Sequence, residues 1–478
     1  MKTLMALVLV MATAVVALGA ENPLAWPRFR GPGGSGVAQD QRPPIELGPN
    51  RNVKWRVAVP SGLSSPIVAG DKLVITAIED DKLYTIAYSR ATGKEAWRVP
   101  APAERIEAYN KAEGSPAAST PVTDGERIVS YFGSCGLLCY DLEGNELWRY
   151  KLPVASSAGD FGSGTSPILA DGTVVLVRDQ TQGSKIIALD AADGSPKWDQ
   201  PRQSPASWCT PVVWDTPAGK QVAAAGHGRM VGYDLTTGAE RWWLVGMPSG
   251  CCSSPVVADG VLFFAGWSPG GGDDPEFQMP TFDQLLKNLD KDADGALSRA
   301  EADAAFEGMF DSQDTDKDGQ ITRQEFDAIV KFMAEGVSSA FALKAGGSGD
   351  VTQSHVLWKQ TRGLPYIASA ILYRGQYVMV KDGGLVTSYD AQTGAERFGG
   401  RLAAVGKYYA SPVAAGGHIY FTSLDGAVTV VNVTGQRPVV AARNPALEER
   451  TAATPAIADD TLYIRTAGNL YAFTEEAQ

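Results

Sequence analysis

Residues 188–198 read Ala-Leu-Asp-Ala-Ala-Asp-Gly-Ser-Pro-Lys-Trp, and versions of this stretch return along the whole chain. Residues 233–238 read Tyr-Asp-Leu-Thr-Thr-Gly and lead to Trp242 in the same way. A recurring unit of this kind is the mark of a repeat architecture. In each copy a large side chain stands four positions after a turn glycine: Gly93 with Trp97, Gly144 with Trp148, Gly194 with Trp198, Gly238 with Trp242, Gly394 with Phe398, and Gly435 with Val439.

Each unit begins with a Ser-Pro or Thr-Pro pair and continues in short apolar stretches that are separated by turn residues such as Asp-Gly. The starts recur about every 44 residues, with one longer interval between Ser254 and Ser369. A unit of this length holds four short antiparallel strands, which make one propeller blade. The sequence therefore predicts an all-β, eight-bladed β-propeller of four-stranded blades. The eight starts are Ser65-Pro66, Thr120-Pro121, Ser166-Pro167, Thr210-Pro211, Ser254-Pro255, Ser411-Pro412, Thr454-Pro455 and the degenerate Ser369-Ala370.

The two ends of the repeat region complement each other. The last unit stops after residues 469–473 without a fourth strand, whereas a strand at 52–57, which contains Trp55, precedes the first start. We expect the N-terminal strand to complete the eighth blade, because an open ring would leave an unpaired strand edge.

The Gly–Trp units resemble the tryptophan-docking repeat of the PQQ-like β-propellers. That family includes quinoprotein dehydrogenases and the propeller subunit of the bacterial outer-membrane β-barrel assembly machinery. The opening segment, Trp26-Pro27-Arg28-Phe29-Arg30-Gly31-Pro32, is also similar to exported PQQ-like propellers of environmental bacteria. Such a repeat specifies fold strongly and function weakly. Its Trp side chains are expected to pack between blades, each with its indole N–H bonded in the next blade; they are Trp97, Trp148, Trp198, Trp242 and Trp358.

An acidic insert, residues 275–335, interrupts the fifth blade between its second and third strands. It holds fifteen Asp and Glu against six Lys and Arg, so most of the chain's net charge of -12 belongs to it. The propeller is thereby divided into residues 21–274 and 336–478. Because this remainder is nearly neutral and has no basic stripe, nucleic acid is not expected as a partner.

Two twelve-residue loops in the insert match the EF-hand pattern. Calcium prefers oxygen ligands, and each loop offers carboxylates at positions 1, 3 and 5, a backbone carbonyl at 7, a water-mediated contact at 9 and a bidentate Glu at 12. Gly295 and Gly319 supply the turn at position 6. We therefore predict two calcium sites. Their ligands are Asp290, Asp292, Asp294, Ala296, Ser298 and Glu301 in the first loop, and Asp314, Asp316, Asp318, Gln320, Thr322 and Glu325 in the second.

The connection between the loops is short. Residues 302–313 fit one helix that serves both loops, and this predicts that the loops do not lie side by side as in ordinary EF-hand pairs. Flanking helices are expected near residues 281–289 and 322–333. The sequence allows two placements of this insert. It either covers the mouth of the propeller channel or lies on the outside of the propeller as a calcium-stabilised appendage.

Residues 1–20 have the layout of a cleaved secretory signal peptide. Lys2 precedes an apolar run that ends in the small residues Gly19 and Ala20. No Cys follows the run to accept a lipid, and no later stretch is apolar for the length that a membrane span needs. The mature protein is expected to be soluble and periplasmic or secreted.

The five cysteines are too few to build the fold with disulfides. Cys251 and Cys252 resemble the adjacent cysteines that form a disulfide in quinoprotein dehydrogenases. They are also compatible with two independent thiols, or with a disulfide between one of them and Cys209. Cys135 and Cys139 are interpreted as structural. Three polar groups at blade positions are interpreted as solvated turns: Arg178-Asp179, His227-Gly228-Arg229 and Lys381-Asp382.

Three functions remain open. We favour a binding or scaffold protein whose rim or channel takes a protein, a peptide or a small molecule, with calcium ordering the insert. A PQQ-dependent oxidoreductase is the alternative; it requires convergent carboxylates and an Arg in the channel, and no catalytic or PQQ-binding residue is identifiable. An outer-membrane protein assembly factor is the third, implied by the resemblance alone.

Overall fold

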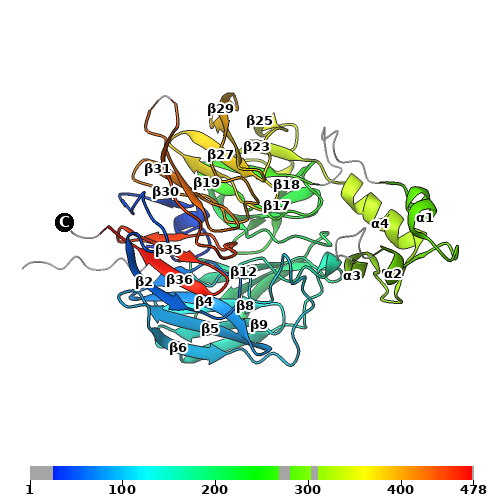
Figure 1. The fold of residues 1–478 in the computed structure, drawn as a ribbon, viewed down its shortest axis with the longest axis horizontal. Coiled ribbons are helices and arrows are strands. Elements are labelled where there is room, and N and C mark those ends of the chain that lie inside the picture. Colours follow the sequence, from blue (N-terminus) through cyan, green and yellow to red (C-terminus); the bar gives the residue numbers. More distant parts are fainter. Residues whose placement is uncertain (1–24, 269–279, 303–309, 436, 476–478) are drawn as a thin grey trace, which may run out of the picture.

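The computed structural model describes residues 25–268, 280–302, 310–435 and 437–475. Successive four-stranded antiparallel sheets are arranged as the blades of a propeller (Figure 1). The predicted all-β, eight-bladed fold is confirmed. The predicted signal peptide lies outside the described residues.

The first four blades follow one another in the chain. Their strands are β3 (Ile67–Ala69), β4 (Lys72–Glu79), β5 (Lys82–Ser89) and β6 (Glu95–Pro100); β7 (Val122–Thr123), β8 (Arg127–Phe132), β9 (Gly136–Asp141) and β10 (Glu146–Lys151); β11 (Ile168–Ala170), β12 (Thr173–Arg178), β13 (Lys185–Asp190) and β14 (Pro196–Pro201); and β15 (Val212–Thr216), β16 (Gly219–Ala225), β17 (Arg229–Asp234) and β18 (Glu240–Val245).

The remaining blades contain the insert and the ring closure. Their strands are β19 (Val256–Ala258), β20 (Val261–Gly266), β23 (Ser339–Lys344) and β25 (Val356–Gln360); β26 (Ile371–Tyr373), β27 (Gln376–Lys381), β28 (Leu385–Asp390) and β29 (Glu396–Arg401); β30 (Val413–Ala415), β31 (His418–Thr422), β32 (Val428–Asn432) and β33 (Val439–Arg443); and β34 (Ala456–Ala458), β35 (Thr461–Arg465), β36 (Asn469–Phe473) and β2 (Val53–Ala58).

The strands differ in burial according to their place in a blade. Every residue of β12 is buried, because neighbouring blades cover both of its faces. The outer strand β14 alternates and turns Trp198 inward. The fourth strand of the eighth blade is β2, which pairs antiparallel with β36 from Val53↔Phe473 to Ala58↔Asn469. The predicted closure by the N-terminal strand is thus confirmed.

A closed ring of hydrogen bonds joins the blade starts, and we call it the hydroxyl ring. At each start the backbone N–H donates to the hydroxyl of the next start, over 2.9 to 3.1 Å. The last bond runs from Thr454 N to Ser65 Oγ and closes the circle. Ser369 keeps its place in the ring although Ala370 replaces the usual proline. The members are Ser65, Thr120, Ser166, Thr210, Ser254, Ser369, Ser411 and Thr454.

The Trp side chains lock each blade to the next. Trp148 Nε1 donates to Ala191 O over 2.9 Å, and its ring lies against Gly194, where a Cβ atom would come within 2.6 Å of it. Trp97, Trp198 and Trp358 make the same bond to the next blade, over 2.9 to 3.0 Å. The turn glycine is therefore required by the indole of the preceding blade as well as by its own positive φ.

Trp242 departs from this pattern. Its Nε1 donates to Gln221 Oε1 of its own blade over 2.7 Å, and its ring packs edge-on against Trp214. The expected bond to the next blade is therefore wrong for Trp242. The physical reason is a longer turn in blade five, in which β24 (Gly349–Asp350) adds to the edge of β18 instead of presenting a docking glycine.

The N-terminal segment that includes Trp26 and Arg30 crosses the propeller and ties distant blades together. It continues through η1 (Pro32–Gly34) into β1 (Val37–Ala38), which pairs with β30. Trp26 O accepts from Val68 N in the first blade, and Arg28 Nη2 donates to Pro211 O in the fourth blade over 3.0 Å. The buried Arg30 reaches Ala370 O in the sixth blade. The segment therefore plugs one end of the channel.

The insert forms a small helical body on one side of the propeller (Figure 1). Its elements are α1 (Phe282–Leu289), β21 (Leu297–Ser298), α2 (Arg299–Ala302), α3 (Phe310–Gln313), β22 (Gln320–Ile321) and α4 (Arg323–Ala334). Its own apolar cluster includes Phe282, Leu297, Phe310, Ile321 and Phe326. The predicted single helix over 302–313 falls partly on residues 303–309, outside the described residues.

One expectation about the insert is wrong. The two acidic loops do lie side by side, because β21 pairs antiparallel with β22 through Leu297↔Ile321 and Ser298↔Gln320. This pairing needs only two residues from each loop, so a short connection does not prevent it.

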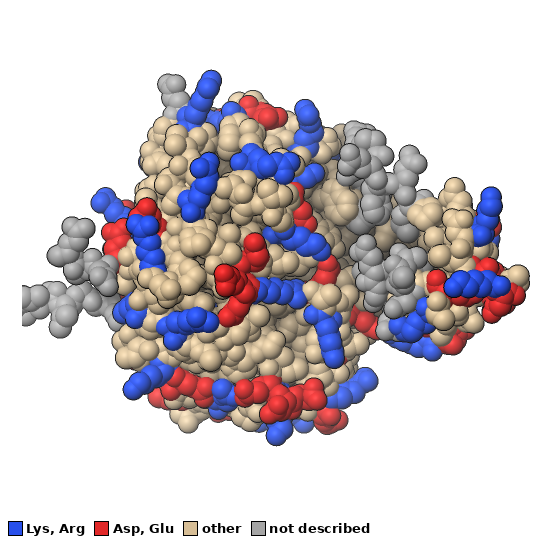
Figure 2. Space-filling view, in the orientation of Figure 1, with Lys and Arg blue, Asp and Glu red and all other residues tan. Residues whose placement is uncertain are grey.

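Charged side chains are mixed on the face shown in Figure 2. Basic and acidic groups alternate over the blades, and this face carries no continuous basic stripe. In the part of the chain that the structure describes, no helix is both long enough and apolar enough to cross a membrane.

Replacing one hydroxyl of the ring tests its contribution to stability. Thr210→Val keeps the side-chain shape but leaves the buried N–H of Ser166 without its acceptor, so the free energy of unfolding is expected to fall by about 1–3 kcal/mol. Chemical denaturation measures the change. Thr236→Val, at an exposed turn position, is the control and is expected to change stability little; equal effects of the two substitutions would contradict the role of the ring.

Candidate functional site

A cavity of about 510 Å³ occupies the channel on the far side of the plug. All members of the hydroxyl ring line it, and Phe29 of the plug closes it from below. Aromatic rings form its walls, most of them in connections between blades and one, Trp267, directly after β20, and three residues of the insert complete it. The wall rings belong to Phe161, Trp208, Trp267, Tyr366 and Tyr409, and the insert contributes Gln313, Phe332 and Met333.

The wall rings are held in edge-on pairs. Trp208 and Phe161 meet with their centroids 5.7 Å apart at 84°, and Trp267 and Tyr366 meet at 5.6 Å and 86°. Trp208 Nε1 donates to Gly162 O over 2.7 Å, so its indole is fixed in place. Edge-on pairs of this kind stabilise a defined wall geometry.

Glu113 is the one charged side chain among the described residues that line the cavity. Its Oε1 accepts from Tyr409 OH over 2.9 Å, and Lys407 Nζ lies 3.7 Å from the same atom. Burial, followed by the nearby Glu113 carboxylate, raises the pKa of the Cys252 thiol to about 12. Burial and Glu113 also raise the pKa of Tyr409. The described lining therefore contains one acidic group, Glu113, which pairs with a lysine outside the lining.

The insert contacts the propeller rim at the mouth of this cavity. Phe332 of α4 stacks on His227 with centroids 4.6 Å apart, and Glu335 Oε2 lies 3.0 Å from His227 Nε2. Lys317 forms an ion pair with Asp160, which lies in the connection before the third blade. Of the two placements left open by the sequence, contact with the cavity is the one described here, because Gln313 of α3 and Phe332 and Met333 of α4 line it. In Figure 1, α1 lies farther from the blades than α3 and α4.

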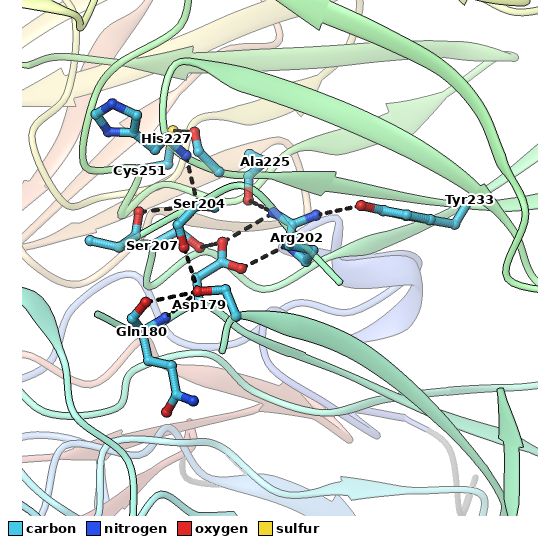
Figure 3. Close-up of polar contacts among 12 residues, drawn as sticks. Asp179, Gln180, Arg202, Ser204, Ser207, Ala225, His227, Tyr233 and Cys251 are labelled. Atoms are coloured by element: carbon cyan, nitrogen blue, oxygen red, sulfur yellow. Dashed lines mark hydrogen bonds and ion pairs between the residues drawn. The ribbon is translucent and has the colours of Figure 1, made fainter. Parts of the chain in front are cut away.

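A buried ion pair supports the rim beneath the insert (Figure 3). Arg202 donates two hydrogen bonds to the Asp179 carboxylate, over 2.7 and 3.0 Å. The side chains of Arg202 and Asp179 are 3% and 0% exposed. Ser207 Oγ also donates to Asp179, and Arg202 Nη1 reaches Tyr233 OH. Both carboxylate oxygens of Asp179 accept from protein donors, and Arg202 also contacts Tyr233 of blade four, so this pair is a structural tie between blades three and four.

The predicted solvated turns are therefore wrong at Arg178-Asp179. Arg178 is 5% exposed and Asp179 is buried, because the third blade directs both toward its neighbours. His227 is 13% exposed, since the insert covers it. The remaining pair, Lys381-Asp382, is half-buried, and Asp382 accepts from Tyr408 N.

In each acidic loop, three of the six predicted metal ligands lie close together. The carboxylate oxygens of Asp290, Asp292 and Asp294 lie within 4.8 Å of one another, and so do those of Asp314, Asp316 and Glu325. Gly295 and Gly319 have φ of 86° and 90°, the left-handed conformation expected at position 6.

The other predicted ligands make bonds within their loops. Glu301 accepts from the backbone N–H of Lys291 and Ser298, and Asp318 accepts from Gln320 N over 2.8 Å. Ser298 and Thr322 donate their hydroxyls to Glu301 and Glu325. Ala296 directly precedes β21, and Gln320 is the first residue of β22.

Comparison with known proteins assigns the propeller to a family. A family model described as outer membrane protein assembly factor BamB matches residues 84–268 and 348–476, on both sides of the insert. The chain belongs to this family. A comparison with curated protein sequences gives no match.

Solved structures share the fold of this family member at low sequence identity. The crystal structure of BamB from Moraxella catarrhalis aligns with a TM-score of 0.54 and 14% identity, covering 89% of this chain and 98% of that one. The quinohemoprotein alcohol dehydrogenase from Comamonas testosteroni aligns with a TM-score of 0.54 and 11% identity, covering 96% and 82%. The computationally designed Ika8 protein gives 0.55 and 11%, covering 87% and 98%.

The cysteines are all free thiols. Cys251 and Cys252 are therefore two independent thiols, one of the interpretations that the sequence left open. Cys251 Sγ donates to Gly226 O and is buried beside Cys209, whereas Cys252 lines the cavity. Cys135 is half-buried and Cys139 is buried.

Sequence reasoning did not identify the residues of the cavity wall. Glu113, Trp208, Tyr366 and Tyr409 lie in connections between blades, where no repeat position marks them. The one available signal was the longer interval between the first two blade starts, which contains Glu113.

Glu107 lies behind the cavity wall and generates a pH-dependent prediction. Burial raises its pKa from 4.5 to about 7, although Ser163 Oγ donates to its Oε2 over 2.7 Å. The neutral form is thus favoured in the folded state, and the free energy of unfolding should fall by about 3 kcal/mol as pH rises from 4.5 through 7.

The measurement is the free energy of unfolding of the wild type and of Glu107→Gln between pH 4 and pH 8. Since Gln does not ionise, the variant is expected to become more stable than the wild type toward pH 8. A difference that stays constant across this range would rule out the raised pKa.

Proposed function

We propose that this protein is an exported, calcium-binding propeller that acts as a binding scaffold, with the channel cavity as its ligand site and the insert as a calcium-ordered cover. One observation carries the proposal. Gln313 ends α3 directly before the second acidic loop, Phe332 and Met333 lie on α4 directly after it, and all three line the cavity. Calcium in that loop would fix two parts of the cavity mouth relative to each other.

The acidic loops have the chemistry of EF-hands. Three carboxylates within 4.8 Å of one another repel each other, and a hard cation that takes oxygen ligands removes this repulsion. Thr281 and Thr322 begin α1 and α4 with capping boxes, so the helix that leads into the first loop and the helix that leaves the second are set by local sequence. This supports two calcium sites formed by the twelve predicted ligand residues.

The family supports a role in protein interaction. The description of the matching model names an outer membrane protein assembly factor, and BamB shares the fold. A partner for this chain is then a protein, a peptide or a small molecule that binds the rim or the cavity. Export to the periplasm or outside the cell rests on the signal-peptide pattern of residues 1–20.

The cavity lining does not favour the alternative of a PQQ-dependent oxidoreductase. PQQ is an anion that carries carboxylate groups, and its binding calls for basic side chains together with several metal-binding carboxylates. The described lining offers one carboxylate, that of Glu113, and neither Lys nor Arg. We therefore derive no reaction from PQQ for this cavity.

Removing the first ligand of each loop tests the calcium proposal. Asp290→Ala combined with Asp314→Ala should abolish calcium binding, which calorimetric titration of the mature protein measures as about two sites in the wild type. Protection of the insert from proteolysis by calcium should be lost as well. The propeller should unfold at an unchanged temperature, because its blades pack without the insert.

Asp327→Ala is the matched control, since this exposed carboxylate lies on α4 outside the loop. It should bind calcium like the wild type. Undiminished calcium binding by the double variant would show that the loops are not the sites, and failure of that variant to fold would show that the insert is not autonomous.

A further inference from the structure

We infer that the channel cavity binds a small organic cation, such as a quaternary ammonium group on a weakly polar body, between its aromatic walls and Glu113. The inference rests on the proposed function, because it names the class of ligand for the same cavity. Three features of the lining support it: its rings, its charge and its volume.

The rings come from separate segments of the chain and converge on one space. Trp208 lies in the connection between blades three and four, Trp267 directly after β20 within blade five, and Tyr366 between blades five and six. Phe332 adds a ring from the insert. An aromatic face attracts a cation within about 6 Å, by about 0.5–2 kcal/mol. Walls of this composition hold a methylated ammonium group better than they hold a strongly hydrated anion.

The described cavity lining contains an acidic side chain and no basic one. Glu113 stands in the wall with its side chain 25% exposed, and the described lining contains no basic side chain to balance it. Lys407 approaches Glu113 Oε1 at 3.7 Å, but its own side chain is 58% exposed and does not line the cavity. Tyr409 and Lys407 both approach the Glu113 carboxylate at Oε1. Because the described lining itself adds no positive charge, an anionic ligand would meet this carboxylate without a basic side chain to bind it, whereas a cation is attracted to it.

The cavity is larger than the charged group of the ligand alone. A cavity of about 510 Å³ exceeds an ammonium head group and extends down to the hydroxyl ring and Phe29. The ring hydroxyls accept hydrogen bonds from backbone N–H groups, as Thr120 does from Ser65 N, and each retains an O–H that can donate. The lower part of the cavity is therefore suited to a weakly polar body that carries a hydrogen-bond acceptor.

The test compares a cation with its neutral isostere. The calcium-loaded mature protein is titrated calorimetrically with choline and with 3,3-dimethylbutan-1-ol, in which carbon replaces the charged nitrogen. The wild type should bind choline at least about tenfold more tightly than the alcohol. Quenching of Trp fluorescence by choline provides a second readout.

Variants then locate the site. Glu113→Gln should weaken choline binding about tenfold and leave the alcohol unaffected, so that the preference disappears. Trp208→Leu should weaken choline binding through loss of a ring. Glu143→Gln, at an exposed turn of the second blade, is the charge-matched control and should behave like the wild type. Thermal unfolding confirms that each variant is folded.

The possible outcomes separate this inference from the proposed function. Equal affinity for choline and the alcohol, or an unchanged preference in Glu113→Gln, overturns the assignment of a cation. The same holds if choline does not bind at millimolar concentration while calcium still titrates the insert, and in that case the calcium-binding scaffold stands. Loss of the calcium sites with retained choline binding would overturn the proposed function instead.

Discussion

The hydroxyl ring is the constraint on which the rest of the structure depends. Each blade start uses its backbone N–H to hold the hydroxyl of the next start, and the bond from Thr454 to Ser65 makes the chain of contacts circular. A buried N–H without an acceptor is costly, so no blade can shift along the channel without breaking two bonds of the ring. The ring therefore fixes the floor of the cavity and the points from which the wall connections leave the blades.

The sequence predicted the features that are encoded locally and repeated. Gly194 and Trp198 specify one turn and one docking indole, and the same spacing around the chain specifies the blades. Closure by residues 52–57 followed from a missing strand at the C-terminal end. The acidic loops were identified in the same way, because each is a contiguous pattern that needs no tertiary contact to be recognised.

Features that depend on distant contacts were not predicted. Asp179 looked like part of a solvated turn because the sequence does not show that Arg202, which follows the last strand of the same blade, lies opposite it. The two acidic loops lie side by side because two residues of β21 pair with two of β22. So short a pairing leaves no hydrophobic periodicity in the sequence from which it could be predicted. The cavity wall is assembled from connections such as the one that carries Glu113, and convergence of this kind exists only in the closed ring.

The insert connects the second acidic loop directly to the channel cavity. Gln313 and Asp314 are adjacent in the chain, so the second acidic loop begins next to a residue that lines the cavity. Lys317 within that loop forms an ion pair with Asp160, and Glu335 after α4 contacts His227, so both the loop and the end of α4 contact the propeller rim. Calcium bound as proposed would draw Asp314, Asp316 and Glu325 together and would thereby act on the connection between α3 and α4. Because the hydroxyl ring holds the floor of the cavity through bonds within the propeller, the proposed effect of calcium is expected at the mouth, where the insert lies.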